Sequence, residues 1–204
     1  MRVGGVNLDG ILELPPGAQS VILFAHGSGS GRFSPRNNYV ASVLRNSGIG
    51  TLLFDLLTNV EDQVYENRFD IDLLAERLGG ATDWLLDKTE GASIGYFGAS
   101  TGAAAALVAS VKRPEVAAIV SRGGRPDLAW DYLGSVKAPT LLIIGGLDTD
   151  VLSLNERALE QLTGRKKLVV IPGATHLFEE PGTLEEVSKA AASWFTEFLE
   201  GISG

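Results

Sequence analysis

The sequence predicts an α/β protein with a mostly parallel central sheet, helices on both faces of that sheet, and no sizeable cap domain. Two observations support this prediction. Short, continuous apolar runs, typical of strands buried on both faces, alternate along the chain with amphipathic segments of helical period. The connections between these segments are short, and this order of elements is typical of a parallel sheet covered by helices.

The composition of the chain favours one domain over residues 1–204 and excludes several kinds of site. With 45% hydrophobic residues, the chain can bury a substantial core. The net charge of −8 argues against nucleic acid and anionic membranes as partners. The absence of cysteine excludes disulfides, thiolate metal sites and a cysteine nucleophile, and it is consistent with a cytoplasmic protein. We expect a monomer or small homo-oligomer with no signal peptide, membrane span, metal or cofactor.

The first half of the chain is expected to begin with one or two short strands in residues 2–14, followed by a Pro-Pro-Gly turn. It is expected to end in an amphipathic helix over 70–88, because leucine and alanine recur at steps of four and three from Leu74 to Leu85. Between these segments we expect a buried strand at 20–25, a helix at 39–46, a buried strand at 49–54 and a loop at 56–69.

The second half continues the alternation of apolar strand and helix. Its last helix is expected to bury one stripe, because apolar residues recur at alternating steps of three and four from Leu184 to Phe198. Before it we expect strands from 94 onward and at 116–120, 139–144 and 167–171, with helices from 101 to about 112 and from about 154 to 162.

Ser100 is the candidate nucleophile. It is the centre of a G-x-S-x-G pattern, Gly98 to Gly102, between an apolar strand and a helix that begins with small residues. Flanking glycines permit a sharp bend at the serine, and the start of the helix supplies free N–H groups for an oxyanion. The same pattern occurs around Ser93, but Ser93 enters the strand whereas Ser100 leaves it. Because ligands of parallel sheets bind at the carboxyl ends of strands, position selects Ser100.

Two later strand ends carry the groups that a serine nucleophile needs. Asp148 or Asp150 follows one apolar strand, and His176 follows the next. An imidazole accepts the proton of the serine, and a carboxylate orients the imidazole. We choose Asp148 as the acid because it comes first after a Gly-Gly turn, while Asp150 is expected to be a helix cap or the alternative acid. His26, the other histidine, is expected to hydrogen-bond the loop that follows it.

Loops after other strands supply further candidates. The glycine-rich loop 26–31 lacks the spacing of nucleotide-binding loops. It is therefore expected to be either a flexible loop or the source of an oxyanion-binding N–H group at Ser28. Arg122 and Arg125 follow the strand at 116–120. They are interpreted either as a solvated or salt-bridged pair or, for one of them, as part of a pocket that favours anionic substrates.

Five segments spread over the chain match a known family. They are 26–31 (HGSGSG), 34–37 (SPRN), 98–102 (GASTG), 145–148 (GGLD) and 173–178 (GATHLF). With these motifs the chain resembles the α/β-hydrolase superfamily and, within it, the small cap-less group related to dienelactone hydrolase. The resemblance implies a nucleophile at Ser100, an acid at Asp148, a base at His176, and oxyanion donors at the N–H groups of Thr101 and Ser28. Arg36 and Arg122 are the candidate substrate-binding residues.

The hypothesis from sequence is a metal-independent serine hydrolase, a carboxylesterase that cleaves small esters through an acyl-enzyme on Ser100. Dienelactone hydrolases use a cysteine nucleophile, so their lactone substrate is not carried over to this chain. A thioesterase, lactonase, peptidase or acyltransferase would use the same three residues. A non-catalytic ligand-binding protein on the same fold is the alternative from another class. The expected partner is a small-molecule ester at an open, shallow site.

Overall fold

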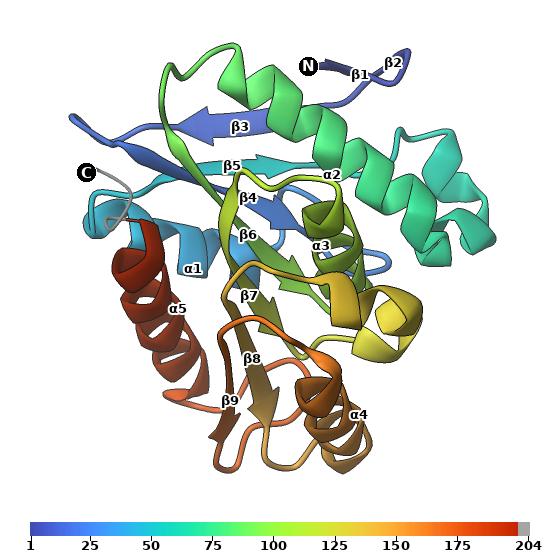
Figure 1. Ribbon diagram of the computed structural model, residues 1–204, viewed down its shortest axis with the longest axis vertical. Helices are drawn as coiled ribbons and strands as arrows, with labels where there is room; N and C mark the ends of the chain where they lie inside the picture. Colours follow the sequence, from blue (N-terminus) through green and yellow to red (C-terminus); the bar gives the residue numbers. More distant parts are fainter. Residues whose placement is uncertain (200–204) are drawn as a thin grey trace.

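A seven-stranded sheet forms the centre of the computed structural model, which describes residues 1–199 (Figure 1). Across the sheet the strands follow the order β3-β5-β4-β6-β7-β8-β9, and only β3 runs antiparallel to its neighbour. The strands are β3 (Gly10–Glu13), β4 (Ser20–Ala25), β5 (Gly50–Phe54), β6 (Ser93–Ala99), β7 (Val116–Arg122), β8 (Thr140–Gly145) and β9 (Lys166–Ile171). β1 (Arg2–Val3) and β2 (Val6–Asn7) form a separate two-stranded hairpin.

Helices cover both faces of the sheet, as the alternation of strands and helices predicts. α1 (Pro35–Asn46) and α5 (Thr183–Leu199) lie on one face, and α2 (Ile71–Leu86), α3 (Thr101–Val111) and α4 (Thr149–Gln161) lie on the other (Figure 1). Each face has its own apolar core. The first contains Leu44 of α1 and Phe195 of α5, and the second contains Leu78 of α2 and the alanines of α3. The predicted fold class is therefore confirmed.

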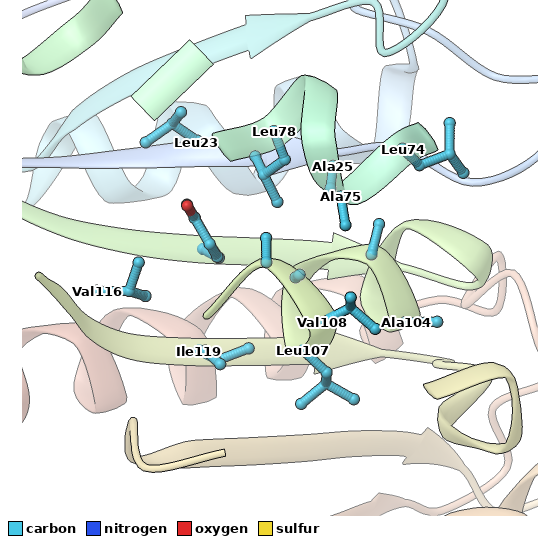
Figure 2. Close-up of a cluster of buried hydrophobic side chains, with 14 of the residues drawn as sticks. Leu23, Ala25, Leu74, Ala75, Leu78, Ala104, Leu107, Val108, Val116 and Ile119 are labelled. Atoms are coloured by element: carbon cyan, nitrogen blue, oxygen red, sulfur yellow. The ribbon is translucent and has the colours of Figure 1, made fainter. Parts of the chain in front are cut away.

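α3 packs closely against the sheet because most of its side chains are small. Figure 2 shows Ala104, Leu107 and Val108 of α3 in the same cluster as Leu74 and Leu78 of α2. All five are at most 3% exposed. This packing holds the N-terminus of α3 against the turn that precedes it, where the candidate nucleophile Ser100 lies.

Several boundaries differ from those expected. α1 begins at Pro35 and not at 39, because Ser34 caps the helix and Pro35 has the fixed φ that suits its first position. The side chain of Ser34 accepts a hydrogen bond from the N–H of Asn37 at 3.3 Å. α4 begins at Thr149 and not near 154, so Asp148 occupies the position before its first residue. β7 continues to Arg122 and not to 120, which places this arginine inside the sheet.

The expected loop at 56–69 contains two short 3₁₀ helices, η1 (Glu61–Gln63) and η2 (Tyr65–Phe69). A longer 3₁₀ segment, η3 (Pro126–Ser135), connects β7 to β8. None of the helices in residues 1–199 combines the length and apolar character that crossing a membrane requires. The six parallel strands end at one edge of the sheet, and the candidate residues follow those ends.

Candidate active site

Ser100 lies on a strained turn between β6 and α3. Its backbone has φ 51° and ψ −118°, a conformation that a residue with a side chain rarely adopts. The close approach of neighbouring backbone explains the two flanking glycines. A Cβ atom at Gly98 would overlap Ala103, and one at Gly102 would overlap the carbonyl oxygens of Ala25 and His26. The G-x-S-x-G pattern therefore reflects packing that only glycine permits at these positions.

The second serine of the same pattern, Ser93, lies at the opposite end of β6. It pairs in register with Ser20, the first residue of β4, and its N–H donates to the carbonyl of Gln19 at 2.9 Å. Ser93 is thus at the amino edge of the sheet, away from the strand ends that carry the other candidates.

Asp148 and His176 form a direct hydrogen-bonded pair. Nδ1 of His176 donates to Oδ2 of Asp148 at 2.6 Å. Asp148 stands at the N-cap position of α4, but its side chain makes no capping bond and reaches His176 instead. Asp150 lies in the first turn of α4 and is exposed to solvent. The geometry therefore brings Asp148, and not Asp150, to the histidine.

The end of β7 connects Ser100 to the His176 ring. The N–H of Ser100 donates to the carbonyl of Arg122 at 3.2 Å. The next residue, Gly123, has φ +53°, and a Cβ atom there would lie 3.3 Å from Cε1 of His176. Within residues 1–199 no hydrogen bond joins the Ser100 hydroxyl to His176. Such a bond is often long in an enzyme without substrate and shortens when the reacting complex forms.

A carboxylate that sequence reasoning missed fixes the loop of His176. Glu180 accepts hydrogen bonds from the N–H of Thr175 at 3.1 Å and from the Thr175 hydroxyl at 2.6 Å. These bonds, led by the one from the hydroxyl, lower the pKa of Glu180. Phe178, two residues after the histidine, has φ 55° and is buried. No periodicity or motif marks Glu180, because its role depends on how the turn folds back.

The glycine-rich loop after β4 is anchored at His26 and at Ser28. Nε2 of His26 accepts a hydrogen bond from the N–H of Leu56 at 3.0 Å, so this nitrogen carries no proton. Burial lowers the pKa of His26, which agrees with a neutral ring. The N–H of Ser28, the expected oxyanion donor, donates to the hydroxyl of Thr101 at 2.9 Å. The loop thus lies against the first residue of α3, with its predicted donor engaged by Thr101.

The three arginines singled out in the sequence have different surroundings. Arg125 forms a paired contact with Asp127, at 2.8 and 2.7 Å, which is the salt-bridged arrangement considered for it. Arg36 donates to Glu179 at 2.8 Å. Arg122 is only 6% exposed and forms no salt bridge with any residue of the described part of the chain. Among residues 1–199 no group of three or more His, Cys, Asp and Glu side chains is arranged to bind a metal ion.

A model of the dienelactone hydrolase family matches residues 46–202, which is most of the chain. The chain belongs to the dienelactone hydrolase family. As a member of this family it has the α/β-hydrolase fold, and the resemblance stated from its motifs is confirmed.

Solved structures and curated relatives agree with this membership. A dienelactone hydrolase from Anabaena variabilis is 58% identical, with a TM-score of 0.93 over 97% of this chain and 94% of that one. Est1E from Butyrivibrio proteoclasticus shares the fold, with 17% identity and a TM-score of 0.81 over 95% of each chain. A Mycobacterium tuberculosis protein with the provisional name of a phosphoribosyl transferase is 58% identical over 97% of this chain. This chain covers only 45% of that relative's length.

Proposed function

We propose that this member of the dienelactone hydrolase family is a serine hydrolase that cleaves small carboxylic esters. The observation that supports this most strongly is the 2.6 Å hydrogen bond between Asp148 and His176, at the same sheet edge as Ser100 on its strained turn. A serine hydroxyl is a poor nucleophile at neutral pH and needs a neighbouring base. The pair supplies a base of fixed orientation, because the Asp148 carboxylate accepts a hydrogen bond from Nδ1–H and leaves Nε2 free to accept a proton.

In the proposed reaction, Oγ of Ser100 attacks the carbonyl carbon of the ester while Nε2 of His176 accepts the hydroxyl proton. The resulting imidazolium is stabilised by Asp148 and donates its proton to the departing alcohol. The acyl group remains on Ser100. Water then attacks the acyl-enzyme with His176 again as the base, which releases the carboxylic acid and restores the serine hydroxyl.

The oxyanion of each tetrahedral intermediate would be bound by the N–H groups of Thr101 and Ser28. Thr101 is the first residue of α3, so its N–H has no partner within the helix and lies at the positive end of the helix dipole. The Ser28 N–H donates to the neutral hydroxyl of Thr101 in the free protein. A charged oxyanion is a stronger acceptor than a hydroxyl, so we propose that this N–H changes partner when the oxyanion forms.

A thioesterase, lactonase, peptidase or acyltransferase would use the same three side chains, and so these activities remain alternatives within the proposal. The name phosphoribosyl transferase belongs to relatives about twice as long as this chain. This chain, which covers 45% of their length, matches the model of a hydrolase family. We therefore assign hydrolysis, and not phosphoribosyl transfer, to the residues described here.

The test is hydrolysis of 4-nitrophenyl acetate, with a thioester and a lactone as further substrates. Replacing Ser100 or His176 by alanine should lower kcat by several orders of magnitude, because each is part of one catalytic unit. Ser93→Ala is the matched control, since Ser93 has the same sequence pattern at the opposite end of β6. Retention of most activity by His176→Ala would refute the mechanism. Ligand binding without any turnover would favour the non-catalytic alternative.

A further inference from the structure

The Arg122 side chain is a buried positive charge without a negative partner in the described part of the chain. Arg122 is 6% exposed, and its one hydrogen bond is a long one, 3.4 Å from Nη2 to Oδ1 of Asn37. Its buried Nε atom has no hydrogen-bond partner among residues 1–199. The guanidinium carbon also lies 5.8 Å from the ring centroid of Phe178, a cation–π contact. A guanidinium carries five N–H donors, and the one on Nε is buried without an acceptor among the described residues.

A second guanidinium, that of Arg36, faces the same region. Its buried Nε atom also lacks a partner among the described residues, although its Nη1 donates to Glu179 at 2.8 Å. Burial and then the positive charge of Arg36 lower the pKa of Arg122 to about 10, so Arg122 stays protonated at neutral pH. The protein therefore places the half-buried charge of Arg36 near the buried charge of Arg122. This arrangement is unfavourable unless a negative charge is bound there.

The two acids that directly follow Phe178 are already engaged. Glu179 accepts from Arg36 at the outer side, and Glu180 accepts from Thr175. The first turn of α1, which carries Arg36 and Asn37, adds the positive end of a twelve-residue helix. Two guanidinium groups thus lie near this helix end, and neither Glu179 nor Glu180 is paired with Arg122.

We propose that Arg36, Asn37 and Arg122 form a binding subsite for a small oxyanion, a carboxylate or phosphate group. Guanidinium groups bind such anions through paired, charge-assisted hydrogen bonds, which the two unpartnered Nε atoms can donate. The side chain of Arg36 is 30% exposed, so the anion reaches Arg122 from the side of Arg36.

The subsite adjoins the candidate catalytic residues. The carbonyl of Arg122 accepts from the N–H of Ser100, and Phe178 lies two residues after His176. An anion bound there is either a charged group of the ester itself or a free anion such as inorganic phosphate. The first source rests on the proposed hydrolase function, whereas the second does not.

The first arm of the test measures binding without turnover. The midpoint of thermal unfolding is followed with inorganic phosphate and with sodium chloride of equal ionic strength. Phosphate at about 100 times its Kd should raise the midpoint of the wild type by several degrees. Arg122→Gln should abolish this rise, and Arg125→Gln, which removes the same charge from an arginine that has its own acid, should retain it. Because Ser100→Ala should also retain the rise, this arm stands even if the hydrolase proposal fails.

The second arm compares kcat/KM for 4-nitrophenyl acetate with that for the singly charged 4-nitrophenyl ester of succinic acid. If the anion belongs to the substrate, Arg122→Gln should lower kcat/KM for the charged ester, relative to kcat/KM for the neutral ester, about tenfold or more. The reason is that charge-assisted hydrogen bonds to the charged ester are lost. Arg125→Gln should leave the ratio unchanged. If Arg122→Gln does not fold, both measurements are made on Arg36→Gln, because the side chain of Arg36 is closer to solvent.

The outcomes separate the two sources. A phosphate effect alone supports the subsite with a free anion, and an effect on the charged ester alone supports it with a substrate group. If neither phosphate binding nor ester preference differs between the wild type and the Arg122 and Arg36 variants, the proposal is overturned.

Discussion

Nδ1 of His176 lies 2.6 Å from Oδ2 of Asp148, although these residues are 28 positions apart in the chain. Their meeting follows from the sheet. β8 and β9 are parallel neighbours whose last residues, Gly145 and Ile171, are paired in register. The two turns that follow therefore leave the sheet side by side. A Cβ atom on Gly145 would overlap the carbonyl oxygens of Ala174 and Thr175, so a glycine is needed for the turns to approach this closely.

Asp148→Asn should lower kcat for an activated ester by about 10³- to 10⁴-fold, because an amide cannot fix the required imidazole tautomer or stabilise the imidazolium. Asp150→Asn is the matched control and should stay within about twofold of the wild type, since Asp150 is exposed in the first turn of α4. Steady-state kinetics of both variants decide between the two acids. A large loss in Asp150→Asn with little change in Asp148→Asn would reverse the assignment.

Glu180→Ala should lower kcat about tenfold with a smaller effect on KM, because the loop that carries His176 loses both hydrogen bonds from Thr175. Glu185→Ala, at an exposed position in the first turn of α5, should have no effect. The split between kcat and KM is the informative readout. A change confined to KM would show that Glu180 contacts substrate and does not position the histidine.

Gly102→Ala should destabilise the fold by more than about 2 kcal/mol, because the added methyl group would overlap two backbone carbonyls that cannot move freely. Gly134→Ala, where no atom lies within 4 Å of the new Cβ, should change the free energy of unfolding by less than about 0.5 kcal/mol. Urea unfolding of both variants measures this difference. Equal stability of the two variants would mean that the turn at Ser100 is looser than described.

His26 should make stability depend on pH in a defined direction. Burial lowers its pKa below the ordinary value of 6.5, so the folded state binds fewer protons than the unfolded state in this range. The contribution of His26 is therefore fully present above pH 6.5 and is lost as pH falls from 6.5 toward the folded pKa. The free energy of unfolding should fall less between pH 7.5 and pH 5.5 in His26→Gln than in the wild type. An identical fall in both proteins would contradict this role.

Most of the fold was predictable from the sequence. Strands buried on both faces are encoded by continuous apolar runs, and amphipathic helices by apolar residues that recur every three or four positions. The missed boundaries involve capping. Ser34 and Pro35 begin α1, yet the apolar period that marks this helix starts later in the chain. At α4 the cap position is taken by Asp148, whose side chain bonds a histidine from another turn and not its own helix.

The candidate site was predictable only as a set of residue types at successive strand ends. Glu180 was missed because its partners are defined by a turn that brings positions 175 and 180 together. The engagement of the Ser28 N–H by Thr101 joins residues 73 positions apart and has no pattern in the sequence. The isolation of Arg122 was likewise hidden, since a buried and a solvated arginine are identical in a sequence.

The most direct measurement is mass-spectrometric mapping of the adduct that a fluorophosphonate forms with the native protein. Such reagents phosphonylate a serine only where a base removes its proton and an oxyanion site binds the new oxygen. We predict one adduct, on Ser100, that forms in the wild type and in Ser93→Ala and is lost in His176→Ala. An unlabelled Ser100, or labelling that persists without His176, would contradict the assignment of this protein as a serine hydrolase.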